Sequence, residues 1–223
     1  MKLFAYKQNI EFLLEENKIN HLVIENPEFL DGFVKSLDES YRKLNCDVEL
    51  MDKELLELHK YSYILYSPLE CHYDKKEILK ELYISLIAMI ESSPLAEEYL
   101  KMKTNILQML EEIILHSEYE IEGEEDLNLE TFLKNFNIHL KTPEGNFPER
   151  LIEFSIHLHR LLGKKMIILV GCQQYISNTA YEEIFKQLNY EGIILLMIDG
   201  FQLKELNIEV NEYIIDSDLC ELY

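Results

Sequence analysis

The sequence has few of the residues that shape irregular or fibrous chains, and it has no long apolar run. Its 223 residues include only seven glycines and five prolines, which argues against a loop-rich or fibrous protein. No apolar stretch approaches the roughly 18 residues that cross a bilayer, and acids interrupt the apolar residues near the N-terminus. Neither a membrane span nor a signal peptide is predicted, so we expect a cytoplasmic protein with no membrane partner.

Cysteines are also scarce, and none is close to another in the sequence. Cys46, Cys71, Cys172 and Cys220 form no C-x-x-C pair, so neither a zinc site nor a thioredoxin-like redox site is supported. Four cysteines in a chain of this size do not suggest a disulfide framework. Cys172 follows an apolar run, but no neighbouring base or histidine could activate its thiol. We interpret it as a small buried side chain.

Basic residues are outnumbered two to one. The chain has 21 Lys and Arg against 42 Asp and Glu, a formal net charge of −21. This argues against a protein that coats nucleic acid through overall positive charge. The charge is unevenly distributed, however, because no Lys or Arg lies between Lys103 and Lys134. Net charge bears on solubility and non-specific binding, and it leaves a local basic surface open.

Phosphate-binding and nucleophile motifs are absent. The chain contains neither G-x-x-x-x-G-K-[ST] nor G-x-G-x-x-G, and no G-x-S-x-G turn. After the apolar run at 166–170 the sequence continues Gly-Cys-Gln-Gln-Tyr, without the lysine and hydroxyl that would hold phosphate and magnesium. We therefore predict no enzymatic activity; an NTPase with an unusual loop is the alternative, and we expect it to fail a test of ATP hydrolysis.

Apolar residues make up 48% of the chain, enough for a folded core. Residues 21–25 and 61–66 are typical of buried strands, and a helical pattern follows Asn26-Pro27. Later in the chain, the apolar runs 166–170 and 193–198 are also expected to be buried strands. A helix is expected between them, and Thr179 to Glu182 fits the capping box at its start. A last strand is expected at 213–215. This order predicts an α/β fold with a mostly parallel sheet.

The middle of the chain is helical instead. Apolar residues at 3–4 spacing predict long helices over 75–92 and 95–116, arranged as an antiparallel hairpin, and a short helix over 129–136. We expect this α-helical leg, residues 73–137, to be inserted into an α/β head formed by residues 1–72 and 138–223.

The segment 117–126, SEYEIEGEED, is the densest run of acids. If it is extended, Glu118, Glu120 and Glu122 lie on one face. Carboxylates gathered around a turn suit calcium, which takes six to eight oxygen ligands, although the EF-hand pattern is absent. A solvated acidic loop explains the same residues, since charge runs are usually solvated.

Four segments resemble the CRISPR-associated Csn-two family of type II-A systems. They are HLVIENPEFLDGFVKSL, the helical middle from ILKELYISL to QMLEEII, the acidic turn SEYEIEGEEDLNLETFLKNFNIHL, with its short helix and strand, and FPERLIEFSIHLHRLLGKKMIILVGCQQYISNTAYEEIFKQLNYEGIILLMID. Together they span nearly the whole chain. Their apolar and charged patterns carry the resemblance.

The resemblance implies a head like a P-loop ATPase that lacks the phosphate loop, with an inserted helical leg. It implies a homotetrameric ring, stabilised by calcium, that binds ends of linear double-stranded DNA during spacer acquisition, alongside the CRISPR integrase and the large effector nuclease. By position, the implied calcium ligands are Glu118, Glu120, Glu122, Glu124, Glu125 and Asp126.

The bases form small groups, each of which is explained as a solubility or helix-end charge unless the fold or an oligomer gathers them. The candidate DNA contacts are six lysines: Lys101, Lys103, Lys134, Lys141, Lys164 and Lys165. A different class of function also fits the composition, namely an acidic interaction scaffold that mimics DNA and captures basic partners. Such a mimic would bind no DNA at any calcium level.

Overall fold

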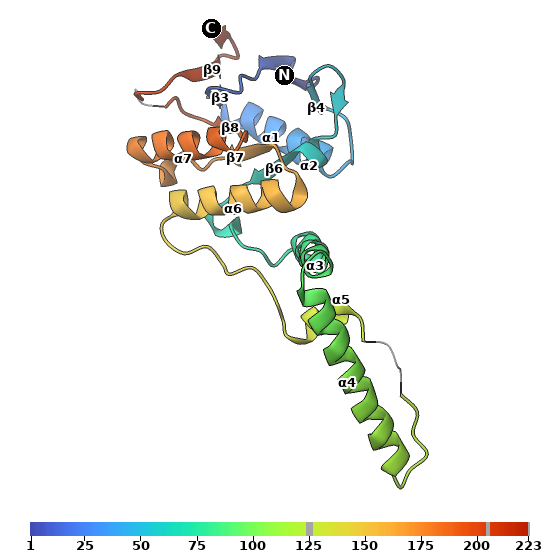
Figure 1. Cartoon of the computed structure of the whole chain (residues 1–223). Helices are drawn as coiled ribbons and strands as arrows, with labels where there is room; N and C mark the ends of the chain where they lie inside the picture. The colour runs from blue at the N-terminus through green and yellow to red at the C-terminus, as the bar shows by residue number, and fades with distance from the viewer. Residues whose placement is uncertain (124–126, 204–205, 223) are drawn as a thin grey trace. The chain divides into compact units, whose positions relative to one another are not determined.

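A computed structural model describes residues 1–123, 127–203 and 206–222, and the chain divides into two compact units. Residues Met1–His72 and Thr142–Tyr223 form the first, called the head unit, and Tyr73–Lys141 form the second, called the helical unit. Figure 1 shows sheets and helices in the head unit and helices alone in the helical unit. In the described residues, no helix is long and apolar enough to cross a membrane.

The head unit is organised around a six-stranded sheet with the order β10-β9-β3-β8-β7-β6. All neighbouring strands are parallel except β10, which pairs antiparallel with β9. The expected α/β fold is therefore confirmed. The strands are β3 (Ile19–Ile24), β6 (Ser62–Leu65), β7 (Met166–Val170), β8 (Ile194–Asp199), β9 (Val210–Ile215) and β10 (Glu221–Leu222).

Alternate residues of these strands face two different layers, which explains why their sequences are continuously apolar. Ile168 and Leu196 belong to a core shared with Phe33 of α1 (Pro27–Tyr41). On the other face, Tyr63 of β6 stacks edge-on against Phe154 of α6 (Phe147–Leu162), with ring centroids 5.4 Å apart. Helix α7 (Asn178–Tyr190) lies beside α6, and Figure 1 shows both on one side of the sheet, with α1 on the other.

A second, four-stranded antiparallel sheet was not predicted from the sequence. Its order is β2-β1-β4-β5, and it packs its apolar side into the core that contains α1. In β1 and β2, buried Leu3, Ala5, Ile10 and Phe12 alternate with more exposed residues, which is the pattern of a sheet covered on one face. The strands are β1 (Lys2–Ala5), β2 (Ile10–Leu13), β4 (Val48–Met51) and β5 (Leu55–Leu56), and the one-turn helix α2 (Leu58–Tyr61) follows them.

The helices of the head unit begin and end where capping residues in the sequence favour it, and one predicted cap is corrected. Asn26 caps α1 by accepting hydrogen bonds from the amides of Glu28 and Phe29. Gly163 ends α6 in the left-handed region, at φ 68°, as the expected stop. The capping box predicted at Thr179 is wrong, because Ser177 caps α7 two residues earlier and accepts from the amide of Ala180. Two 3-10 turns, η1 (Pro68–Glu70) and η2 (Gln173–Tyr175), complete the unit.

The helical unit contains α3 (Lys76–Glu91), α4 (Leu95–His116) and α5 (Leu129–Asn135). The predicted antiparallel hairpin is wrong: Figure 1 shows α3 end-on while α4 runs lengthwise, and no residue of α4 is buried. Near its start, α4 meets α5 through Tyr99, whose hydroxyl donates to the carbonyl of Leu127 at 2.6 Å and whose ring lies 6.1 Å from that of Phe132. The strand expected after α5 is also wrong, since residues 138–141 have no regular structure.

Candidate functional site

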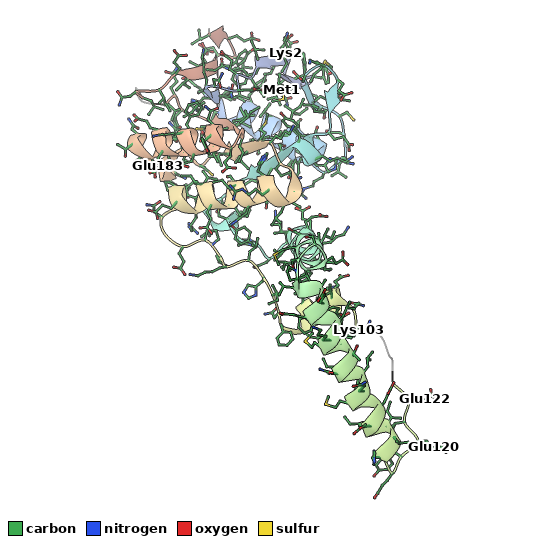
Figure 2. The ribbon with its side chains drawn as sticks, in the orientation of Figure 1. Met1, Lys2, Lys103, Glu120, Glu122 and Glu183 are labelled. Atoms are coloured by element: carbon green, nitrogen blue, oxygen red, sulfur yellow. The ribbon has the colours of Figure 1, made fainter. Side chains whose placement is uncertain are left out.

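The acidic segment leaves the end of α4 and folds back along it. Gly123 lies close to Ile114, because a Cβ at Gly123 would come within 3.3 Å of the Ile114 Cδ1 atom. Glu118, Glu120 and Glu122 are exposed and have no regular secondary structure, and Figure 2 shows the latter two beside the far end of α4. Glu124, Glu125 and Asp126, the other three predicted calcium ligands, lie outside the described residues.

The described carboxylates do not by themselves form a calcium site. Glu122 lines a groove of about 250 Å³ together with Glu111 of α4, so two carboxylates share this groove. Within residues 1–123, 127–203 and 206–222, no group of three or more His, Cys, Asp or Glu side chains is placed to hold a metal. The ligand type suits calcium, but six to eight oxygens are needed. Further donors would have to complete the shell.

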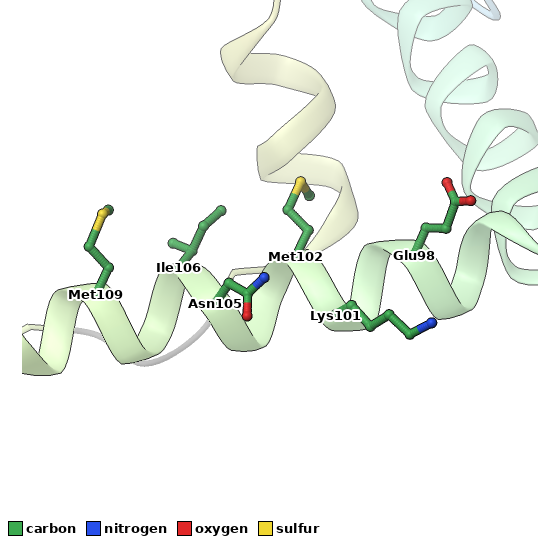
Figure 3. Close-up of a pocket in the computed structure, with 6 residues that line it drawn as sticks. All are labelled: Glu98, Lys101, Met102, Asn105, Ile106 and Met109. Atoms are coloured by element: carbon green, nitrogen blue, oxygen red, sulfur yellow. The ribbon is translucent and has the colours of Figure 1, made fainter.

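Two of the predicted DNA-contacting lysines lie on α4. Lys101 is exposed and Lys103 is half-buried. Lys101 lines a shallow groove of about 500 Å³ on α4. Figure 3 shows that Met102, Ile106 and Met109 extend from one side of the helix, while Lys101 extends from another. The helix therefore presents an apolar stripe and a basic group in different directions.

Two further lysines of the predicted set belong to the same helical unit. Lys134 of α5 is exposed, forms an ion pair with Glu130 at 2.6 Å, and places its ammonium nitrogen 6.0 Å from the centre of the Tyr83 ring. An exposed i,i+4 pair of this kind contributes only a few tenths of a kcal/mol, about 0.3–0.5. A phosphate could therefore replace Glu130 as the partner of Lys134. Lys141 is exposed at the end of the unit.

The last two predicted lysines belong to the head unit and differ from each other. Lys164 is 7% exposed, and its ammonium donates to the carbonyl of His59, so it serves the fold rather than an external phosphate. Lys165 is exposed, while its backbone amide donates to the carbonyl of Tyr61 at 2.8 Å. Among the described residues, neither Lys101 nor Lys165 has an ion-pair partner.

Comparison with known proteins identifies the family. The family model described as "CRISPR-associated protein (Cas_Csn2)" matches residues 41–219, which is most of the chain. The chain belongs to the Csn2 family. Membership implies a CRISPR-associated role in adaptation, the stage of type II immunity at which spacers are acquired. No curated protein sequence matches the chain at a significant level.

One solved structure shares the fold of this chain. The crystal structure of Stu0660 of Streptococcus thermophilus covers 100% of this chain and 76% of its own, with a TM-score of 0.65 and 18% identity. At that identity the likeness shows the fold alone. The ADP conformation of MJ1267, an ATP-binding cassette of an ABC transporter, covers 91% of this chain and 81% of its own at 13% identity, but its TM-score of 0.39 supports no inference.

The structure of this Csn2 chain also shows two features that sequence reasoning did not single out. One is the exposed apolar face of α4, on which Met109 and Ile113 are 56% and 53% exposed. The other is a charged row across the large sheet, where the buried His21 of β3 lies between the partly exposed Glu212 of β9 and the buried Asp199 of β8. The sequence contains a signal for each feature. Apolar residues at 3–4 spacing mark the face of α4, and ionisable residues inside or at the end of apolar runs mark the charged row.

Proposed function

We propose that this protein is a non-enzymatic, ring-forming protein that binds ends of linear double-stranded DNA during spacer acquisition. Family membership carries the proposal, and the exposed lysines support it. Lysines that neutralise phosphates release counterions and bind without reading bases. Lys101, Lys103, Lys134, Lys141 and Lys165 are the contacts proposed here, and Lys164 is left out because it is buried in the head unit.

Assembly into a homotetrameric ring is supported by the apolar face of α4. Met102, Ile106, Met109 and Ile113 repeat at 4-3-4 spacing, which is the a/d spacing of helices that pair side by side. A helix of 22 residues with no buried side chain is unusual for an isolated chain, because an amphipathic helix gains most of its stability from packing its apolar face. A second copy of the chain would cover this face.

The head is proposed to be a P-loop-ATPase-like fold that has lost its phosphate loop. In nucleotide-binding α/β folds a glycine-rich loop joins a central strand to a helix, and free amides at the start of that helix hold the phosphates. Here only Glu25 and Asn26 separate β3 from α1. The Asn26 side chain already accepts from the first helix amides, and Glu25 adds a negative charge. Both features support a non-catalytic head.

Calcium is proposed as the cation that stabilises the ring. The base-free acidic stretch around Glu118, Glu120 and Glu122 supports this part of the proposal, since like charges on one segment repel unless a cation lies between them. The described side chains do not complete a calcium shell. The remaining donors would be Glu124, Glu125 and Asp126 or carboxylates of a second copy. The CRISPR integrase and the large effector nuclease are the proposed protein partners, in the cytoplasm.

The test is a titration of a linear duplex with the full chain, with and without calcium, over a series of salt concentrations. The proposal predicts binding that weakens steeply with salt, because counterion release drives it. The alternative function, an acidic scaffold that mimics DNA, predicts no duplex binding at any calcium level. Under that outcome the exposed acids, rather than the lysines, would form the interaction surface.

A further inference from the structure

The apolar stripe of α4 follows a seven-residue repeat, whose positions are named a to g. Ile106 and Ile113 hold position a, and Met102 and Met109 hold position d. In helices that pair side by side, positions a and d form the contact between the two helices. Figure 3 shows Met102, Ile106 and Met109 extending from the same side of α4. The sequence repeat therefore corresponds to one physical face of the helix.

This stripe is covered at its start and open further along. Tyr99, one repeat before Ile106, lies against Phe132 of α5, with the ring centroids 6.1 Å apart. Beyond that contact Ile106 is half-buried, and Met109 and Ile113 are 56% and 53% exposed. The chain's own α5 thus covers the first turns of α4 and leaves the later turns of the stripe accessible.

The acidic segment that folds back along α4 lies beside the stripe. Ile121 and Gly123 of this segment line a groove with Leu107, Leu110 and Ile114 of the helix. These three residues hold positions b and e of the repeat. An amphipathic helix gains most of its stability by burying its apolar face. Since the exposure of the stripe persists beside this segment, its burial has to come from a second molecule.

The residue types of the stripe favour a pair of helices over larger bundles. In parallel coiled coils, a β-branched residue at position a with leucine at position d favours two strands. Here position a holds isoleucine at Ile106 and Ile113, and position d holds methionine, which like leucine is unbranched at Cβ. The stripe therefore fits one identical helix from a second copy of the chain.

The charges beside the stripe distinguish parallel from antiparallel pairing. Position g holds Glu98, Asn105 and Glu112, and position e holds Lys103 and Leu110. In a parallel pair, position g faces position e of the other helix five residues later, so Glu98 meets Lys103 of the second copy. In an antiparallel pair g faces g and e faces e, and no pair of opposite charge forms. Glu98 also lines the shallow groove of about 500 Å³ on α4, which is open to a side chain from outside.

We propose that two copies of the chain pair through α4 as a parallel, two-stranded coiled coil, in which each stripe residue faces the same residue of the second copy. The proposal rests on the part of the proposed function that places a second copy on this helix, and it adds the orientation and the register. It does not depend on DNA binding. Glu98 and Lys103 set the orientation more than the strength, because exposed ion pairs are weak.

Single cysteines on the stripe test the orientation in the full chain. The exposed natural thiols are first removed by Cys46→Ser and Cys220→Ser. Met102→Cys, Ile106→Cys or Met109→Cys is then added, and each variant is oxidised with diamide. Calcium is present, because both acidic segments lie at the same end of a parallel pair and repel each other. All three variants should form disulfide-linked dimers, whereas antiparallel helices bring identical residues together only at the two-fold axis.

Gln108→Cys is the matched control, because position c lies away from the stripe, and it should remain unlinked. A charge exchange tests the register. Glu98→Lys alone should raise the dissociation constant of the pair about two- to tenfold, since two exposed ion pairs are lost. Adding Lys103→Glu to the same chain should restore it, because the opposite charges then face each other again.

The outcomes separate this pairing from the ring. A natural chain that is monomeric in light scattering would overturn both. An oligomer of unchanged mass in which at most one of the three stripe variants is linked, or in which Gln108→Cys is linked as readily, would overturn the parallel pairing and leave the ring standing. Failure of the double charge exchange to restore the dissociation constant would overturn the assigned register.

Discussion

Replacing His21 by Leu should destabilise the protein, most strongly at mildly acidic pH. His21 is fully buried in β3. Its Nδ1 atom lies 2.9 Å from the Glu212 carboxylate, and its Nε2 atom lies 3.7 Å from that of Asp199. Burial opposes protonation of the imidazole, but the two carboxylates outweigh burial and raise its pKa above 6.5. A cation therefore holds two carboxylates on neighbouring strands together.

The size of the destabilisation depends on the charge that the substitution leaves without a partner. Leucine at position 21 leaves the carboxylate of Asp199 buried without a cation, which costs about 3–5 kcal/mol in comparable pairs. For a chain of this size that corresponds to a fall in Tm of roughly 6–20 °C. Urea unfolding followed by circular dichroism measures the free energy, and His116→Gln, on the exposed surface of α4, is the matched control.

The pH dependence has a defined sign. A histidine whose pKa is raised by folding contributes fully below its unfolded pKa of about 6.5, and the contribution is lost as pH rises through the higher folded pKa. The difference in unfolding free energy between the natural chain and His21→Leu should thus be largest near pH 6 and shrink toward pH 9. A difference below about 0.5 kcal/mol at pH 6, or one that grows with pH, would refute this account of the charged row.

Three further predictions concern assembly, calcium and DNA. Changing Met109 and Ile113 together to Glu should lower the oligomer mass measured by light scattering, because both lie on the exposed apolar face of α4. Changing Glu118, Glu120 and Glu122 together to Ala should weaken calcium binding measured by calorimetry and loosen the oligomer. Lys101→Glu or Lys165→Glu should weaken binding of a linear duplex and reduce the salt slope by about one for each phosphate that is no longer neutralised.

Each of these predictions has a matched control at a site outside the proposed surface. Gln108→Glu adds charge to α4 away from the apolar stripe, so it should leave the mass unchanged. Removing three other exposed acids of the helical unit, Glu91, Glu97 and Glu98, should not change calcium binding. Lys35→Glu alters an exposed lysine of α1 outside the predicted set. If a control has the same effect as its test variant, overall charge rather than the named site accounts for the result.

The parallel sheet was predictable because its strands are buried on both faces. Runs such as Met166–Val170 and Ile194–Asp199 stand out as continuous apolar stretches between helical patterns. The antiparallel sheet was missed because its strands are short and covered on one face only. In the N-terminal hairpin β1 is only four residues long, and in β2 Glu11 separates the buried Ile10 and Phe12, so no long apolar run marks either strand.

The candidate site was only partly predictable, as neighbouring lysines illustrate. Lys164 and Lys165 look alike in the sequence, but they immediately precede β7, where successive side chains point in opposite directions. Lys164 therefore enters the fold and meets the carbonyl of His59, while Lys165 faces outward. Asp199 and His21 were missed for a different reason: their partners come from adjacent strands far apart in sequence, and only the register of β8, β3 and β9 brings them together.

The measurement that tests the central proposal most directly compares one DNA fragment in two forms, linear and covalently closed, at equal concentration, moderate salt and saturating calcium. A ring that threads onto DNA requires a free end, so the linear form should bind and the closed circle should not. Equal binding of both forms would contradict threading and leave lysine contacts to the side of the duplex as the mode of binding. Binding of neither form would contradict DNA binding itself.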